Sequence, residues 1–135
     1  MSLVEVIRQG IEQTAADQES KAWFEGAEGD AITLRFTGGN VISFSVKSGK
    51  LSLVDGDVPN PRGIAEVKPE VFVSFINGKK VFGGLFVHEM AEYFKPVRGE
   101  FYDFGGDFFL LNPVTERLAA LYRKSAGFKQ ALDAC

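Results

Sequence analysis

Strict alternation of apolar and polar side chains between residues 31 and 54 constrains the fold of this chain more than any other feature. Every second residue is apolar in AITLRFT (residues 31–37), and the same alternation returns in NVISFSVK (residues 40–47). The pair Gly38-Gly39 between them is typical of a β-hairpin turn, and Ser48-Gly49 provides a second turn before KLSLV. The sequence therefore predicts a three-stranded antiparallel meander with one face in the core and one in water.

Apolar residues recur at helical spacing both before and after this meander in the sequence. Ser2 and Glu5 form a capping box at the start of a first helix that ends near residue 17. A fourth strand is expected at residues 64–67, followed by a helix that begins at Pro69 and ends at Asn77-Gly78. Further expectations are a short helix at 85–94 that stops before Pro96, one or two strands at 100–111, a helix from Asn112-Pro113 to 122, and a weak helical tail at 128–135.

This order of elements predicts an α+β fold in which a five-stranded, mainly antiparallel sheet carries its helices on one face. With 135 residues the chain fits a single domain, residues 1–135, with its core at about 30–122. The net charge is -3 and the lysines are scattered, which argues against nucleic-acid binding through phosphate contacts. The chain has no apolar run long enough to cross a membrane, and its one cysteine leaves no intramolecular disulfide, so a cytoplasmic location is expected.

Aromatic residues are concentrated between residues 72 and 109, which hold eleven of the seventeen aromatic side chains of the chain. Six glycines interrupt the same stretch. Large rings on an interrupted backbone can leave an apolar pocket, whereas the simpler interpretation is a Phe-rich core under irregular loops. Composition alone leaves both interpretations open.

Three stretches resemble the sterol carrier protein-2 family. The first is AITLRFTGGNVISFSVKSGKLSL, which is similar to the opening meander of that family. The second is GIAEVKPEVFVSFINGK, with a short strand, a helix and a Gly-Lys ending. In the third, VRGEFYDFGGD, Gly99, Phe101, Gly106 and Asp107 take the positions of the family's last strand, and a closing helix follows.

This resemblance implies non-catalytic binding, and with it carrying or transport, of a sterol, a fatty acyl chain or a similar apolar ligand in a hydrophobic tunnel between sheet and helices. No cofactor and no metal is required, and no catalytic residue is assigned. Met90 would suit a loosely specific apolar site because its side chain is flexible. The residues expected to bind the ligand are Phe72, Phe75, Ile76, Phe82, Phe86, Met90, Phe94 and Phe101.

Two alternatives stay open at this point. A small isomerase or lyase would use a carboxylate of raised pKa in an apolar pocket, with Glu89, Glu92 and Asp103 as candidates beside Tyr93 and Tyr102. A dimerising regulatory module would instead expose its aromatic rings as a homodimer interface. Zinc catalysis is disfavoured because His88 is the single histidine of the chain, and such sites usually need three protein ligands.

Overall fold

The computed structural model of the chain describes residues 2–15, 29–81, 87–99 and 107–135. Five strands form one sheet in the order β3-β2-β1-β4-β5. Strands β1 and β4 pair in parallel, and every other neighbouring pair is antiparallel. The mainly antiparallel five-stranded sheet is therefore confirmed. Its strands are β1 (Ala31–Phe36), β2 (Val41–Lys47), β3 (Lys50–Asp55), β4 (Gly63–Val67) and β5 (Lys95–Gly99).

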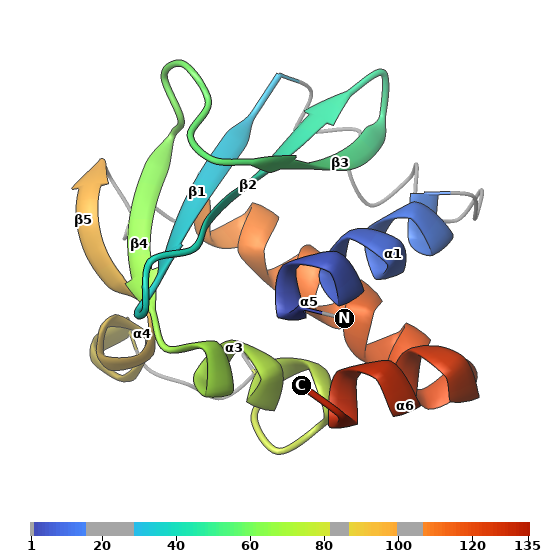
Figure 1. Cartoon of the computed structure of the whole chain (residues 1–135). Helices are drawn as coiled ribbons and strands as arrows, with labels where there is room; N and C mark the ends of the chain where they lie inside the picture. Colours follow the sequence, from blue (N-terminus) through green and yellow to red (C-terminus); the bar gives the residue numbers. More distant parts are fainter. Residues whose placement is uncertain (1, 16–28, 82–86, 100–106) are drawn as a thin grey trace.

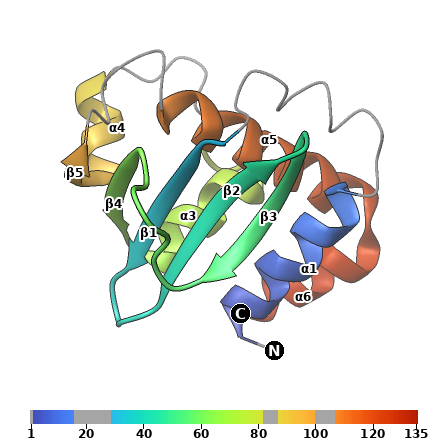
Figure 2. The same cartoon turned by 90° about the horizontal axis from the view of Figure 1, so that it is seen from above.

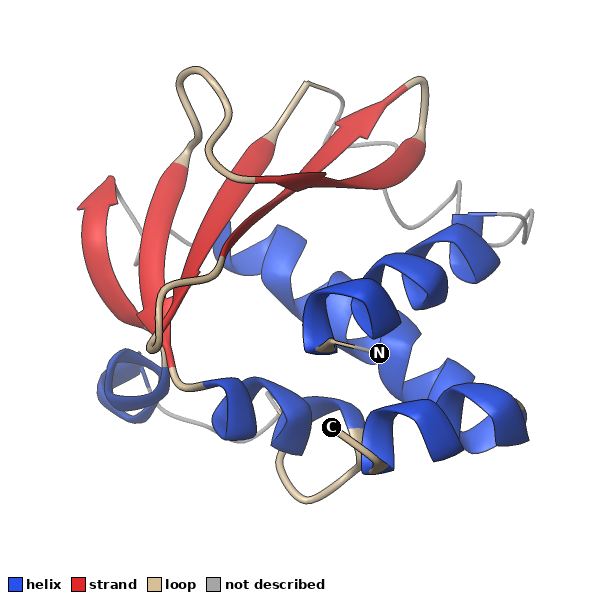
Figure 3. Ribbon diagram, viewed as in Figure 1, coloured by secondary structure: helices blue, strands red, loops and turns tan. Residues whose placement is uncertain are grey.

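Helices lie on one side of this sheet, as Figures 1 and 3 show. Seen from above, the sheet covers α3 and part of α5, while α1 and α6 lie beside the β3 edge (Figure 2). The sheet and these helices enclose the core between them. The helices are α1 (Leu3–Ala15), α3 (Pro69–Ile76), α4 (Val87–Tyr93), α5 (Asp107–Lys124) and α6 (Ala126–Asp133).

The alternation of the meander decides which side chains enter this core. Ile32 and Leu34 of β1 and Phe44 of β2 are fully buried, and they meet Ile7 of α1 and Leu118 of α5 in one apolar cluster. Each buried side chain of this size contributes roughly 1.5–3 kcal/mol relative to exposure. The core therefore joins α1 and α5 to the same face of the sheet.

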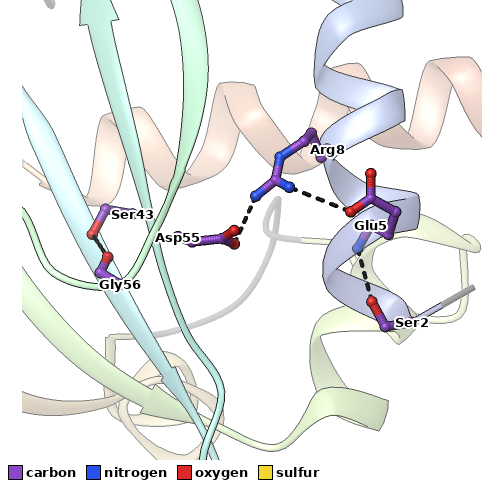
Figure 4. Close-up of polar contacts among 6 residues, drawn as sticks. All are labelled: Ser2, Glu5, Arg8, Ser43, Asp55 and Gly56. Atoms are coloured by element: carbon purple, nitrogen blue, oxygen red, sulfur yellow. Dashed lines mark hydrogen bonds and ion pairs between the residues drawn. The ribbon is translucent and has the colours of Figure 1, made fainter.

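The start of α1 and its link to β3 are shown in Figure 4. The backbone N–H of Glu5 donates to Ser2 Oγ at 3.2 Å, as the capping pattern predicts. One turn later, Arg8 forms an ion pair with Asp55 at the end of β3, with 2.6 Å between Nη2 and Oδ1. The hydrogen bond to Asp55 raises the pKa of the Arg8 guanidinium. This contact joins α1 to the edge strand of the sheet.

The outer face of the meander differs from the prediction of a uniformly wet surface. Thr33 and Ser43 lie on this face, yet both are fully buried. Their hydroxyl groups are 2.8 Å apart, and Ser43 Oγ donates to the carbonyl oxygen of Gly56 at 2.8 Å (Figure 4). In the sheet, β4 lies beyond β2 and β1, so the chain after β3 must cross both strands to reach it. Gly56 lies at the start of this crossing, and its carbonyl oxygen accepts the hydrogen bond from the buried Ser43 hydroxyl.

The largest correction concerns residues 95–111. The fifth strand lies at Lys95–Gly99 and contains Pro96, whereas a strand was expected within 100–111. Strand β5 pairs with β4 alone, and an edge strand tolerates a proline because its outward N–H is not needed. Residues 107–111, predicted as strand, begin α5, and Pro113 lies inside that helix and not at its first position. The remaining residues of the expected strand, 100–106, lie outside the described part of the chain.

Candidate functional site: a groove between α3 and α5

The candidate site is a groove between the end of α3 and the middle of α5, with a volume of about 390 Å³. This volume lies within the roughly 300–1,000 Å³ typical of small-molecule sites. Val81, which follows α3, lies at its margin and is 64% exposed. The described residues that line the groove are Phe75, Val81, Thr115, Glu116, Arg117, Ala119, Ala120 and Arg123.

Local sequence places Phe75 at this groove. Pro69 begins α3, since its fixed φ suits the first helical turn, and Gly78 follows the helix with φ of 87°. Between them Phe72, Phe75 and Ile76 recur at helical spacing and are buried. The short helix therefore directs one continuous apolar face towards the rest of the core.

Contacts with aromatic rings of other elements hold α3 in place. Phe72 packs on the sheet, with its ring centroid 5.6 Å from that of Phe36. Phe75 points elsewhere: its ring lies 5.8 Å from Tyr93 and 5.4 Å from Phe94. Phe75 thus connects the aromatic cluster at the end of α4 with the groove, and it is only 3% exposed.

Helix α5 supplies the other wall. Leu111, Val114 and Leu118 form its buried face, and Ala119 and Ala120 lie beside that face along the groove. Their small side chains leave space where larger residues would fill it. The wall also contains Thr115, whose hydroxyl donates to the carbonyl oxygens of the preceding turn at 3.1 and 3.0 Å. The hydrogen bonds of this buried hydroxyl satisfy its donor within the helix, so it adds little polarity to the groove.

Charged residues occur along the same wall of α5. Glu116 and Arg123 are exposed, and Arg117 is 9% exposed. The groove therefore combines an apolar surface from Phe75, Ala119 and Ala120 with charged groups along one helix. Such a combination suits a ligand that is apolar over most of its length.

Of the eight residues that the sequence analysis proposed for ligand binding, the structure describes the side chains of four. Phe72, Phe75, Ile76 and Phe94 belong to one buried cluster, and among these four Phe75 also lines the groove. Met90 lies in α4, but its side chain is not described. Phe82, Phe86 and Phe101 lie outside the described residues.

Sequence reasoning missed the contribution of α5 to the site. Ala119, Ala120 and Arg123 are not among the predicted site residues, because the periodicity of the closing helix indicates only its apolar face. A signal was present in the sequence: two adjacent alanines follow Leu118, beside the apolar stripe of an otherwise large-residue helix. Small residues at such flanking positions reduce packing on one side of a helix.

The candidates for the enzyme and dimer alternatives are placed as follows. Glu92 is exposed along a separate groove of about 300 Å³ beside β4, and Glu89 is half-buried. Asp103 and Tyr102 lie outside the described residues, as does the side chain of His88.

Within the described ranges, no group of three His, Cys, Asp or Glu residues could hold a metal ion, and no helix is long and apolar enough to span a membrane.

Exposed large apolar side chains in the described part of the chain are Val54, Val81 and Val97. Val54 lies in β3, Val97 in β5 and Val81 in the segment after α3, and no described aromatic ring is among them. The described residues thus provide no exposed aromatic patch of the kind that the dimer interpretation expects.

No protein-family model and no curated protein matches the sequence. Solved structures do share its fold. A protein described as a ubiquinone synthesis protein, UbiJ-SCP2, has a TM-score of 0.62 at 9% identity, covering 88% of this chain and 94% of its own. Sterol carrier protein 2 has a TM-score of 0.61 at 8% identity, covering 87% of this chain and 98% of its own.

A third structure is the conserved hypothetical protein TT1886 from Thermus thermophilus, which its description associates with sterol carrier proteins. It has a TM-score of 0.52 at 17% identity and covers 92% of this chain and 90% of its own. The chain therefore has the fold of sterol carrier protein-2 domains, as its sequence pattern predicts. At these identities the likeness is one of fold.

Proposed function

We propose that the chain binds a lipid or another apolar small molecule non-covalently in the groove between α3 and α5. The observation that carries this proposal is the groove itself, in which Phe75, Ala119 and Ala120 provide apolar walls around about 390 Å³. The shared fold with sterol carrier protein-2 domains adds support. No step of this function requires a catalytic group, a metal or a cofactor.

Physical chemistry makes such binding favourable without a covalent bond. Each methylene group that leaves water contributes roughly 0.8 kcal/mol. A chain of several methylenes along the groove would therefore offset the cost of association, which is at least about 4 kcal/mol. Affinity would rise with the length of the apolar chain until the groove is filled. Ligand binding by Phe82, Phe86, Met90 and Phe101 stays a prediction from the sequence.

The test is to fill the groove without disturbing the core. Ala120 is half-buried and lines the groove, so Ala120→Phe places a ring in the space that the ligand needs. We expect the affinity for the neutral fluorescent probe Nile red to fall at least about tenfold, because the ring occupies the contact surface of the probe.

The matched control is Ala126→Phe, at an exposed position at the start of α6 that does not line the groove. Both substitutions have a similar cost in helix propensity, about 0.5 kcal/mol. Thermal unfolding should show that both variants fold, and Ala126→Phe should bind the probe as the unchanged chain does. Equal binding by all three proteins would show that the apolar site lies elsewhere. Mass spectrometry of an organic extract of the purified protein would independently identify a ligand that co-purifies with it.

A further inference from the structure

The charged residues along the groove are arranged on one helix. Arg123 lies three and four residues after Ala120 and Ala119, so its side chain starts from the same face of α5. Arg117 and Glu116 line the groove on the preceding turns. The wall therefore has two positive charges and one negative charge, although the whole chain has a net charge of -3.

Arg123 differs from the cations of the described chain that form ion pairs. Arg8, Arg62 and Lys129 form ion pairs with Asp55, Asp30 and Asp133 respectively. Among the residues that the structure describes, no carboxylate lies within ion-pair distance of Arg123.

A guanidinium group at the margin of an apolar groove has a specific chemical use. Its planar set of donors matches a carboxylate or phosphate in two parallel hydrogen bonds, and it is less strongly hydrated than an ammonium group. The apolar walls beside it lower the local dielectric constant, which strengthens a charge-assisted hydrogen bond. Glu116 on the same wall reduces the positive potential near Arg123.

We infer that the ligand is an amphiphile with an anionic head group, carboxylate or phosphate, which Arg123 binds while the apolar tail lies against Phe75, Ala119 and Ala120. This inference rests on the proposed function and deepens it, since it selects among apolar ligands those with one negative end. A neutral sterol or alcohol would fill the groove without using Arg123.

The test compares ligands that share a tail and differ in their head group. Oleate, oleyl alcohol and oleoyl lysophosphatidic acid are each titrated to displace Nile red from the unchanged protein and from variants of α5. We expect Arg123→Gln to weaken oleate binding about tenfold and to leave oleyl alcohol binding unchanged, because a hydrogen bond to a charged group is lost only for the anion. Binding of the lysophosphatidic acid tighter than that of oleate would identify a phosphate head group, and the reverse order a carboxylate.

Two further variants separate this role from a structural one. Glu116→Gln removes the negative charge from the wall and should strengthen oleate binding about twofold. Lys124→Gln removes an exposed positive charge that does not line the groove, and it should change little. Thermal unfolding checks that these variants keep the stability of the unchanged chain, so that opposite changes in oleate binding report the charges of the wall.

The outcomes separate the two proposals. Equal affinity for oleate and oleyl alcohol, with Arg123→Gln unchanged, would overturn the inference about the head group and leave apolar binding in the groove intact. Failure of Nile red and all three amphiphiles to bind the unchanged protein would overturn the proposed function as well. A loss of oleate binding equal in Arg123→Gln and Lys124→Gln would show a general effect of surface charge and would also overturn the inference.

Discussion

Replacement of Gly10 by alanine tests how closely α1 approaches α5 and α6. Gly10 lies in the interior of α1 and is buried. A methyl group at this position would lie 2.7 Å from Cε2 of Phe128 and 2.9 Å from Cδ2 of Leu118. Carbon atoms in contact prefer about 3.5–4.0 Å, so the neighbouring side chains would have to move by about 1 Å.

Two opposing effects decide how much Gly10→Ala changes the free energy of unfolding. Alanine in a helix interior is more favourable than glycine by about 0.5–1 kcal/mol. Overpacking of a filled core costs about 1–3 kcal/mol. We therefore expect Gly10→Ala to lower the free energy of unfolding by about 1 kcal/mol, and to lower Tm by about 2–5 °C.

The matched control is Gly127→Ala in α6. Its added methyl group would meet only Ser125 Oγ, at 4.0 Å, which is an ordinary contact. This variant should be neutral or stabilised by up to about 1 kcal/mol, because the gain in helix propensity is not opposed. The same Gly→Ala change is thus expected to lower the free energy of unfolding at position 10 and to leave it unchanged or raise it at position 127. Chemical denaturation of the two variants measures this difference.

Phe128→Leu in the Gly10→Ala background provides a further check. A smaller side chain at 128 relieves the overlap, so the double variant should be more stable than the sum of the single effects by about 0.5–3 kcal/mol. If Gly10→Ala stabilises the protein as much as Gly127→Ala does, α1 does not approach α5 and α6 as closely as described. If the effects in the double variant are additive, Phe128 does not touch residue 10.

Two further predictions concern polar contacts. Ser43→Ala removes the donor to the Gly56 carbonyl and should lower the free energy of unfolding by about 1 kcal/mol, whereas the exposed Ser52→Ala should change it less; urea denaturation compares them. The Tyr122 hydroxyl donates to Asp133 at 2.8 Å and holds the pKa of that carboxyl below its ordinary value. The stabilisation is present above the ordinary pKa of Asp133 and disappears as the pH falls through the lowered pKa. In Tyr122→Phe the titration midpoint of Asp133, followed by NMR, should rise, and an unchanged midpoint would contradict the assigned cause.

Much of the fold could be predicted because local rules and tertiary packing agree in the N-terminal half. Alternation with Gly38-Gly39 produced the observed β1–β2 pair, and Ser2 caps α1 as expected. Pro69 begins α3 where its missing N–H has no cost. In each of these segments the deciding information lies within a few residues.

The predictions were wrong where contacts between distant parts of the chain decide the local structure. The sequence correctly predicts that a helix ends before Pro96, but it does not predict the strand that contains this proline, because β5 accommodates Pro96 by pairing only with β4. Asn112-Pro113 predicts the start of a helix, but the helix begins earlier, at Asp107. The groove depends on how α3 and α5 pack together, so periodicity within either helix could predict Phe75 as an apolar residue but not Ala119 as its counterpart.

The packing of α5 explains why the groove can have an apolar interior without weakening the fold. Leu118 faces α1 and the sheet, whereas Ala119 and Ala120 turn towards the groove within the same helical turn. Packing against Gly10 and against the core thus fixes α5 from one side. Ala119 and Ala120 therefore need no contacts across the groove to hold the helix in position. A binding surface on a rigid element is already organised before the ligand arrives, which lowers the entropy cost of binding. The affinity of the groove should therefore depend on the ligand and on the charges of Arg123 and Glu116 more than on any rearrangement of α5.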